Sequence, residues 1–168
     1  GRFVFVKFIA VGSNGYIVNA PISQQVGNNV WYSIAYGNGK YVAVGGSNLG
    51  GGFITTSTNG VNWTTPKQIP NIKIFNGITY SNGKFVAVSY YGISKGQGYI
   101  STSTDGINWT TPKVVGDGFG WFSVCYSNGK FVAVGDCSGT IGKCGIATSI
   151  DGINWTTINT LVEEYWYS

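Results

Sequence analysis

The side chains that could carry out chemistry in this chain are few, and their identities argue against catalysis. The sequence contains no histidine and a single arginine, Arg2. A serine or cysteine nucleophile needs a neighbouring base, for which histidine is the usual choice, so a triad of that kind is excluded. The remaining candidates are six acidic residues: Asp105, Asp117, Asp136, Asp151, Glu163 and Glu164.

Acid–base catalysis by two carboxylates requires the pair to face each other across a substrate. Glu163 and Glu164 are adjacent, so in a strand they point to opposite faces. Asp117 and Asp136 lie in different loops, and their convergence is the catalytic alternative that the sequence leaves open. We predict that the protein is not an enzyme and uses no cofactor.

All three cysteines lie in one part of the chain. Cys137 and Cys144 flank six residues within one loop, and we predict that they form a disulfide, which implies an oxidising location. Two free thiols are the alternative. Cys125 occupies the place held elsewhere by Ala35 and Thr79, so we predict a small buried side chain. With no histidine, the cysteine spacing matches no zinc pattern, and no metal site is expected.

These residues are set in a chain that repeats itself. The segment from Trp31 to Val44 returns at 75–88 and at 121–134, each time with the turn Asn-Gly-Lys in its middle. A second block of the type Ser-Thr-Asn-Gly-Val-Asn-Trp ends at Trp63, Trp109 and Trp155, which are 46 residues apart. A fixed period of this size indicates one supersecondary unit used several times.

Alternation and turn residues predict four strands in each unit. In the first complete unit they are expected at Tyr32–Tyr36, Tyr41–Gly45 and Phe53–Ser57, with a fourth that starts near Trp63 and ends before Pro66. Four antiparallel strands in about 46 residues are the size of a propeller blade. We therefore predict an all-β, propeller-like fold of about four blades of four antiparallel strands.

The whole chain, 1–168, is expected to form a single repeat domain. Its units are predicted at 1–30 together with 161–168, at 31–74, at 75–120 and at 121–160. The first blade is shared between the N- and C-termini: Lys7–Gly12 and Tyr16–Ala20 match the second and third strands of a unit, and Tyr165–Ser168 matches the beginning of the first. The chain starts at Gly1 without a signal-peptide pattern, which indicates a processed or partial product.

The Ser-x-Asp/Asn-Gly-x-x-Trp block resembles the Asp-box, or BNR-like repeat, of sialidase-like and photosynthetic-assembly-factor-like propellers, although Asp and Gly are one residue closer here. The repeats also resemble those of bacterial surface proteins and phage tail proteins. The resemblance implies a structural turn in which the Asp or Asn side chain accepts backbone N–H bonds and the Trp packs between strands. The turn residues are Asn59, Asp105, Asp151, Trp63, Trp109 and Trp155.

Sialidases of the resembling superfamily hold the substrate carboxylate with several arginines. Arg2 alone cannot build such a clamp, so a sialidase-like hydrolase is a remote alternative. Binding is more plausible than catalysis, because the loops Gly46–Gly52, Tyr90–Gly98 and Asp136–Gly145 differ while their flanks repeat. The candidate glycan-binding residues in these loops are Asn48, Tyr90, Tyr91, Gln97 and Lys143. The alternative is that these are solvated loops, and the recurring Trp31, Phe75, Trp121 and Trp166 are read as core residues.

The N-terminal run from Phe3 to Val11 has no turn residue and is about twice the length of the other strands. Its exposed apolar side chains need a partner, and we predict self-association into a homo-oligomer or filament. The residues expected to mediate it are Phe3, Val4, Phe5, Val6 and Trp166.

The net charge of +4 is small and no basic run exists, so nucleic acid is not an expected partner. No stretch approaches the ~18 apolar residues of a membrane span, so membrane insertion is not expected. Together these features predict a non-enzymatic structural or adhesive module of an extracellular, virion or cell surface. A lectin-like propeller that binds glycans through its variable loops is the alternative.

Overall fold

The computed structural model describes residues 9–19, 22–47, 49–92, 97–116, 120–135 and 143–161. Within them the chain is all β apart from one 3-10 turn at Ser13–Gly15. The strands follow in chain order: β1 (Ile9–Val11), β2 (Tyr16–Asn19), β3 (Ile22–Gln25), β4 (Asn29–Gly37), β5 (Lys40–Ser47), β6 (Gly52–Ser57), β7 (Lys67–Ile69), β8 (Ile72–Ser81), β9 (Lys84–Gly92), β10 (Tyr99–Ser103), β11 (Lys113–Val114), β12 (Trp121–Ser127), β13 (Lys130–Gly135), β14 (Lys143–Ser149) and β15 (Thr156–Leu161).

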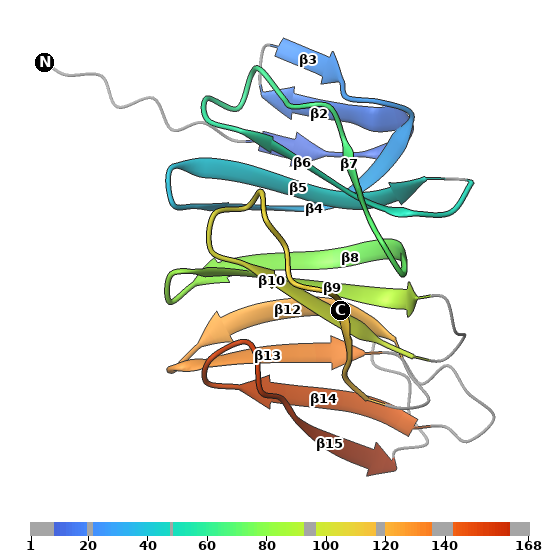
Figure 1. Ribbon diagram of the computed structural model, residues 1–168, viewed down its shortest axis with the longest axis vertical. Coiled ribbons are helices and arrows are strands. Elements are labelled where there is room, and N and C mark those ends of the chain that lie inside the picture. Colours follow the sequence, from blue (N-terminus) through green and yellow to red (C-terminus); the bar gives the residue numbers. More distant parts are fainter. Residues whose placement is uncertain are drawn as a thin grey trace, which may run out of the picture.

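The strands form four antiparallel blades that follow one another along the molecule (Figure 1). The first blade contains β1, β2 and β3, and the next three blades contain β4–β7, β8–β11 and β12–β15. The second and third blades are bridged at one residue pair, Gly46 with Ile74. This is the predicted all-β, propeller-like architecture, and the count of about four blades agrees with the described strands.

Asn-Gly turns close the hairpin between the first two strands of each complete blade. Asn38 and Gly39 have φ values of 46° and 71°, and the pairs Asn82–Gly83 and Asn128–Gly129 repeat this geometry. Positive φ at both central positions is the type I′ turn, whose twist matches that of the flanking strands. The predicted hairpins are therefore confirmed.

The first strand of each complete blade carries one buried aromatic residue at the same repeat position. Trp31, Phe75 and Trp121 are all buried, and a β-bulge follows or surrounds each of them in its strand. The bulge changes the register, so the aromatic side chain turns towards the preceding blade. The interpretation of these three residues as core is confirmed, whereas Trp166 lies outside the described residues.

The position of the fourth strand was predicted wrongly in the first complete unit. It was expected to start near Trp63 and end before Pro66, but β7 begins at Lys67, after the proline. Proline has no N–H to donate to a ladder, and Pro112 delays β11 in the same way. In the fourth blade Ile158 stands at the corresponding place, and β15 starts at Thr156, directly after the tryptophan.

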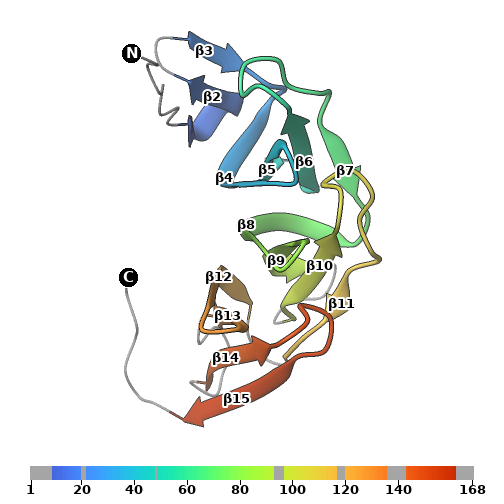
Figure 2. The same cartoon turned by 90° about the vertical axis from the view of Figure 1, so that its left-hand side faces the viewer.

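The blades are arranged as an open arc (Figure 2). Each blade places one sheet face against the next blade: Val42, Val44 and Ile54 of the second blade pack with Phe75, Phe85 and Tyr99 of the third. The same contact joins the third blade to the fourth and the first to the second. The segments expected to complete the first blade, 1–8 and 162–168, lie outside the described residues.

Cys125 corrects a second prediction. It was expected to be buried like its counterparts, but it is an exposed free thiol on β12. Ala35, in the equivalent position of the second blade, packs against the third blade. The face of the fourth blade that carries Cys125 has no following blade among the described residues, which explains the difference.

Candidate grooves between the blades

The repeated turns at the rim are held by side-chain hydrogen bonds to the backbone. Asp105 Oδ1 accepts bonds from the N–H groups of Ile107 and Asn108, both at 2.8 Å, and Ser103 Oγ accepts one from the N–H of Gly106 at 2.8 Å. The turns at Asn59 and Asp151 have the same pattern. Each turn is thus closed by two acceptors: the side-chain oxygen of the Asn or Asp and the hydroxyl of the preceding Ser.

Hydrogen bonding sets the charge state of the two aspartates. The backbone N–H of Asn108, followed by that of Ile107, holds the pKa of Asp105 well below its usual range. The backbone N–H groups of Asn154 and Ile153 lower the pKa of Asp151 in the same way. A strongly acidic, fully committed carboxylate is a poor proton donor at neutral pH. Both side chains are therefore engaged in turn formation.

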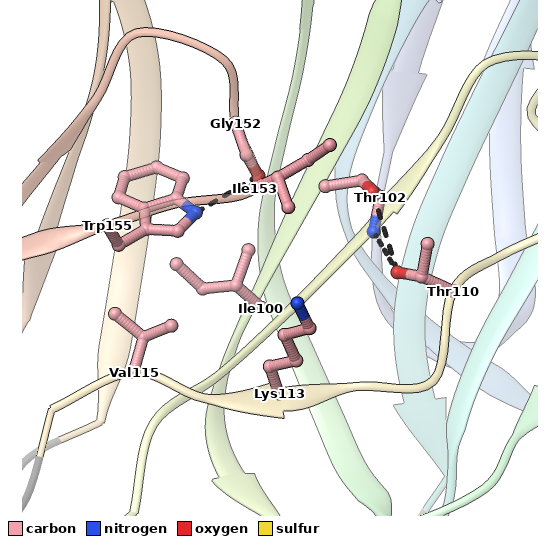
Figure 3. Close-up of a pocket in the computed structure, with 8 residues that line it drawn as sticks. All are labelled: Ile100, Thr102, Thr110, Lys113, Val115, Gly152, Ile153 and Trp155. Carbon is pink, nitrogen blue, oxygen red and sulfur yellow. Dashed lines mark hydrogen bonds between the residues drawn. The ribbon is translucent and has the colours of Figure 1, made fainter.

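The turns of the third and fourth blades each present a tryptophan to a groove at the boundary with the preceding blade. Trp155 donates its indole N–H to the carbonyl of Gly152 at 3.0 Å, which fixes the ring over the turn (Figure 3). The groove beside it has a volume of about 70 Å³. It is lined by Ile100, Thr102, Thr110, Lys113, Val115, Gly152, Ile153 and Trp155.

An equivalent groove with a volume of about 210 Å³ lies between the second and third blades. Seven of its lining residues occupy the same repeat positions as those of the smaller groove: Ile54, Thr56, Thr64, Lys67, Gly106, Ile107 and Trp109. Its threonine hydroxyls are partly engaged, since Thr64 Oγ1 accepts the N–H of Thr56 at 3.0 Å. The Lys67 ammonium donates to the carbonyl of Ile107 at 3.3 Å, which links the two blades.

The rim of the fourth blade carries a wider hollow of about 360 Å³. Thr148 and Thr156 line it, and they correspond to the threonine pairs of the two grooves. No turn of a following blade covers this hollow among the described residues. The recurrence of the same residues therefore marks the rim at these two boundaries, and the matching edge of the fourth blade, as candidate binding positions.

The structure does not bring the predicted glycan-binding residues together in one described site. One face of the Tyr90 ring stacks on Phe122 at 4.6 Å, and Gln97 accepts the Tyr99 hydroxyl at 3.2 Å. Both side chains are thus partly occupied by packing or hydrogen bonding. Asn48 lies outside the described residues, as do the side chains of Tyr91 and Lys143.

Several other predictions fall outside the described part of the chain. They are the Cys137–Cys144 disulfide, the Asp117–Asp136 pair, the two adjacent glutamates Glu163 and Glu164, and the N-terminal arm Phe3–Val6. Among the residues that are described, no three His, Cys, Asp or Glu side chains gather as a metal site. No helix of the described chain has the length and apolar character needed to span a membrane.

Sequence reasoning missed the grooves, although a signal for them is present. The tryptophan of the turn is followed by Thr-Thr-Pro-Lys at both Trp63 and Trp109. The proline delays the fourth strand, so the threonines and the lysine line the boundary with the next blade. The repeated Lys after Pro was the feature that pointed to this position.

Comparison with known proteins places the chain among β-propellers by fold. No family model and no curated protein matches the sequence. YCF48, solved with a bound D1 peptide, is 16% identical with a TM-score of 0.54, over 90% of this chain and 49% of that one. A protein of unknown function from Dyadobacter fermentans is 14% identical with a TM-score of 0.55, over 90% of this chain and 56% of that one.

A weaker likeness connects the chain to a propeller-type glycoside hydrolase. A mutant family 32 β-fructofuranosidase from Bombyx mori, in complex with sucrose, is 15% identical with a TM-score of 0.48, over 76% of this chain and 35% of that one. The chain therefore spans between about a third and just over half of these structures. Such low identities establish the fold alone, and the Asp-box family remains a resemblance carried by the turns.

Proposed function

We propose that this chain is a non-enzymatic structural or adhesive β-propeller module that associates with itself. The observation that carries the proposal is an apolar sheet face at each end of the row of blades that no other described blade covers. Ile146 and Ile158 are exposed at one end, and Tyr16 and Val18 at the other. Contiguous exposed apolar side chains on a sheet are characteristic of an interaction surface.

The composition supports a location on an extracellular, virion or cell surface. Charged residues are 10% of the chain, and neutral polar residues such as Asn and Thr take their place in the repeats. A low-charge β surface depends little on ionic strength, which suits a module that operates outside the cell. The missing histidines and the single arginine support a role without catalysis.

Self-association through the terminal segments is the proposed mechanism. Phe3, Val4, Phe5 and Val6 would pair with a neighbouring subunit, and Trp166 would contribute the aromatic position seen at Trp31 and Trp121. Analytical ultracentrifugation of the full chain over a wide concentration range should show association. Deleting residues 1–6 should weaken it while the far-UV circular dichroism spectrum stays β-type. A full-length chain that sediments as a monomer at high concentration would contradict the proposal.

Glycan binding is a second candidate, and the recurring grooves favour it. An indole, two threonine hydroxyls and an ammonium group line each one, which combines a stacking surface with hydrogen-bonding groups. A glycan array should show binding that Lys67→Glu lowers, whereas Lys40→Glu, at a hairpin end away from the grooves, should leave it unchanged. An array without signal, or equal loss in both variants, would reject this candidate.

A further inference from the structure

The described blades repeat a single kind of contact. The face of each blade that carries the second-strand valines covers the aromatic face of the next blade. In the second blade Val44 and Ile54 of this face are 0% and 3% exposed, and in the third Val88 and Ile100 are 0% and 4% exposed. The leading face of a blade is therefore built to be covered by the trailing face of another.

The fourth blade has the same leading face, and none of the other described blades covers it. Val134 pairs with Ile146, and Ile146 pairs with Ile158, so the three side chains form one row across the sheet. Their exposures are 44%, 37% and 50%. We call this row, together with Cys125 on the same sheet face, the tail face.

The first blade carries the matching trailing face, which no other blade covers in the described part of the chain. Ala10 and Val18 are cross-strand partners on β1 and β2, and both are exposed together with Tyr16. In the second blade the corresponding residues are Ala43, Phe53 and Thr55, which face the first blade. We call Ala10, Tyr16 and Val18 the head face.

We infer that the tail face of one copy of this chain docks on the head face of a second copy, and that two such contacts close a ring of two chains. The residues named in the two faces are uncharged, and residues 9–25 contain no charged residue at all. Lys130 lies on the same sheet face as Val134, at the place of Lys84, whose ammonium donates to the carbonyl of Asp151 in the next blade at 2.9 Å. Burial of the apolar row itself therefore buries no charge. The contact would repeat the blade-to-blade packing that the chain already uses three times.

The closed arrangement follows from the shape of the arc. A head-to-tail contact produces a ring when its rotation closes and a filament when it does not. The four blades already bend into an open arc (Figure 2), and the chain covers 49% and 56% of two solved structures with the same fold. Two arcs joined through equivalent junctions therefore complete the circle. This inference rests on the proposed self-association and names its surfaces and its stoichiometry.

Charge substitutions in the two faces test the inference. Ile146→Lys alters the tail face, and Tyr16→Glu alters the head face. The counterparts of these residues, Ile54 and Tyr99, share one core cluster at the junction between the second and third blades. Val114→Lys is the matched control, because Val114 is an equally exposed apolar strand residue away from both faces. Light scattering coupled to size exclusion gives the mass of each variant.

The wild type should have twice the 17.9 kDa mass of one chain. Each single variant should dissociate, with affinity weakened roughly tenfold or more by an unpaired charge in the junction. Val114→Lys should remain a pair, and combining Ile146→Lys with Tyr16→Glu in one chain should restore part of the association. Circular dichroism and the melting temperature of the isolated chains confirm that the variants are folded.

The outcomes separate this inference from the function on which it rests. If the Ile146→Lys or Tyr16→Glu variant associates as strongly as the wild type, the proposed surfaces are wrong and self-association itself still stands. A wild type that forms open multimers through these faces overturns the two-chain ring. A wild type that stays at the mass of one chain at every concentration overturns both proposals.

Discussion

At the scale of the residue, the clearest chemical feature is a pair of aspartates committed to turns. Each carboxylate accepts two backbone N–H groups and a side-chain amide, as Asp151 does from Ile153, Asn154 and the Asn154 Nδ2 group. The repeat shows that the charge itself is dispensable, because Asn59 accepts the same two backbone bonds. Shape and acceptor geometry, more than charge, define this turn.

Removing the acceptor should destabilise the protein. We expect Asp105→Ala and Asp151→Ala each to lower the free energy of unfolding by about 1 kcal/mol or more, because backbone N–H groups lose their partners. Urea denaturation followed by tryptophan fluorescence gives the value. An unchanged stability would show that water replaces the side chain without cost, and the structural role would be refuted.

The aspartates also make stability depend on acidity. Their folded-state pKa lies below the ordinary value of 3.8, so the unfolded chain binds protons first as the pH falls. The contribution is complete well above that value and is lost progressively below about pH 5. The double variant Asp105→Asn/Asp151→Asn, which copies the turn at Asn59, should keep the turn. Its stability should fall less than that of the wild type as the pH is lowered. Melting curves from about pH 2 to about pH 7 check it, because the loss begins near the ordinary pKa of 3.8 and continues below it. If the double variant loses stability at low pH as steeply as the wild type, the two aspartates are not the cause of the pH dependence.

At the scale of the element, the sequence was sufficient where a local rule acts alone. The Asn-Gly pairs predicted the hairpins because type I′ turns require positive φ at two successive residues. The fourth strand was misplaced because its start depends on where Pro66 can lie relative to a neighbouring strand, which is a matter of sheet pairing. Cys125 was misread for a related reason, since its burial depends on a neighbouring blade.

The candidate site was less predictable than the fold. Variation among the loops drew attention to Tyr90 and its neighbours, but the Tyr90 ring is used to pack on Phe122. The grooves, in contrast, consist of residues that repeat, and repetition suggested a purely structural role. A groove forms only when one blade lies against the next, so its residues come from two units and no single unit reveals it.

Gly45 packs closely against the first strand of its blade, and this contact can be tested by substitution. A Cβ at Gly45 would lie 1.9 Å from the carbonyl oxygen of Val30, whereas the equivalent Gly12 has nothing within 4 Å. Gly45→Ala should therefore cost about 1–3 kcal/mol of stability through overpacking. Gly12→Ala, the matched control, should stay within about 0.5 kcal/mol. Both are measured by urea denaturation in the Ile146→Lys background, so that association does not contribute. Equal effects would show that the bulge does not constrain this position.

At the scale of the whole molecule, the blades form a row whose ends are chemically complementary. Interior blades bury the faces that the first and fourth blades expose, and the exposed side chains are apolar in both cases. A row of this kind has two ways to cover its ends: additional blades or another copy. The uncharged, apolar residues named in both faces favour close packing in either case.

Cys125 offers a direct probe of the tail face. In a variant with Cys137→Ser and Cys144→Ser, alkylation of the remaining thiol should be fast when the protein is dilute and slow when it is concentrated, because a second copy covers it. Adding Ile146→Lys should keep the reaction fast at every concentration. Mass spectrometry of timed samples gives the rates. If the alkylation rate of Cys125 does not depend on protein concentration in the variant that keeps Ile146, a second copy does not cover the tail face.

Electron microscopy of the negatively stained wild-type protein tests the central claim most directly. The blades of one chain form an arc, and we infer that a second copy completes the ring. Class averages should show round particles with radial blades around a central channel and an approximate twofold symmetry. Compact single-chain particles without radial repetition, or two stacked sheets, would contradict the account.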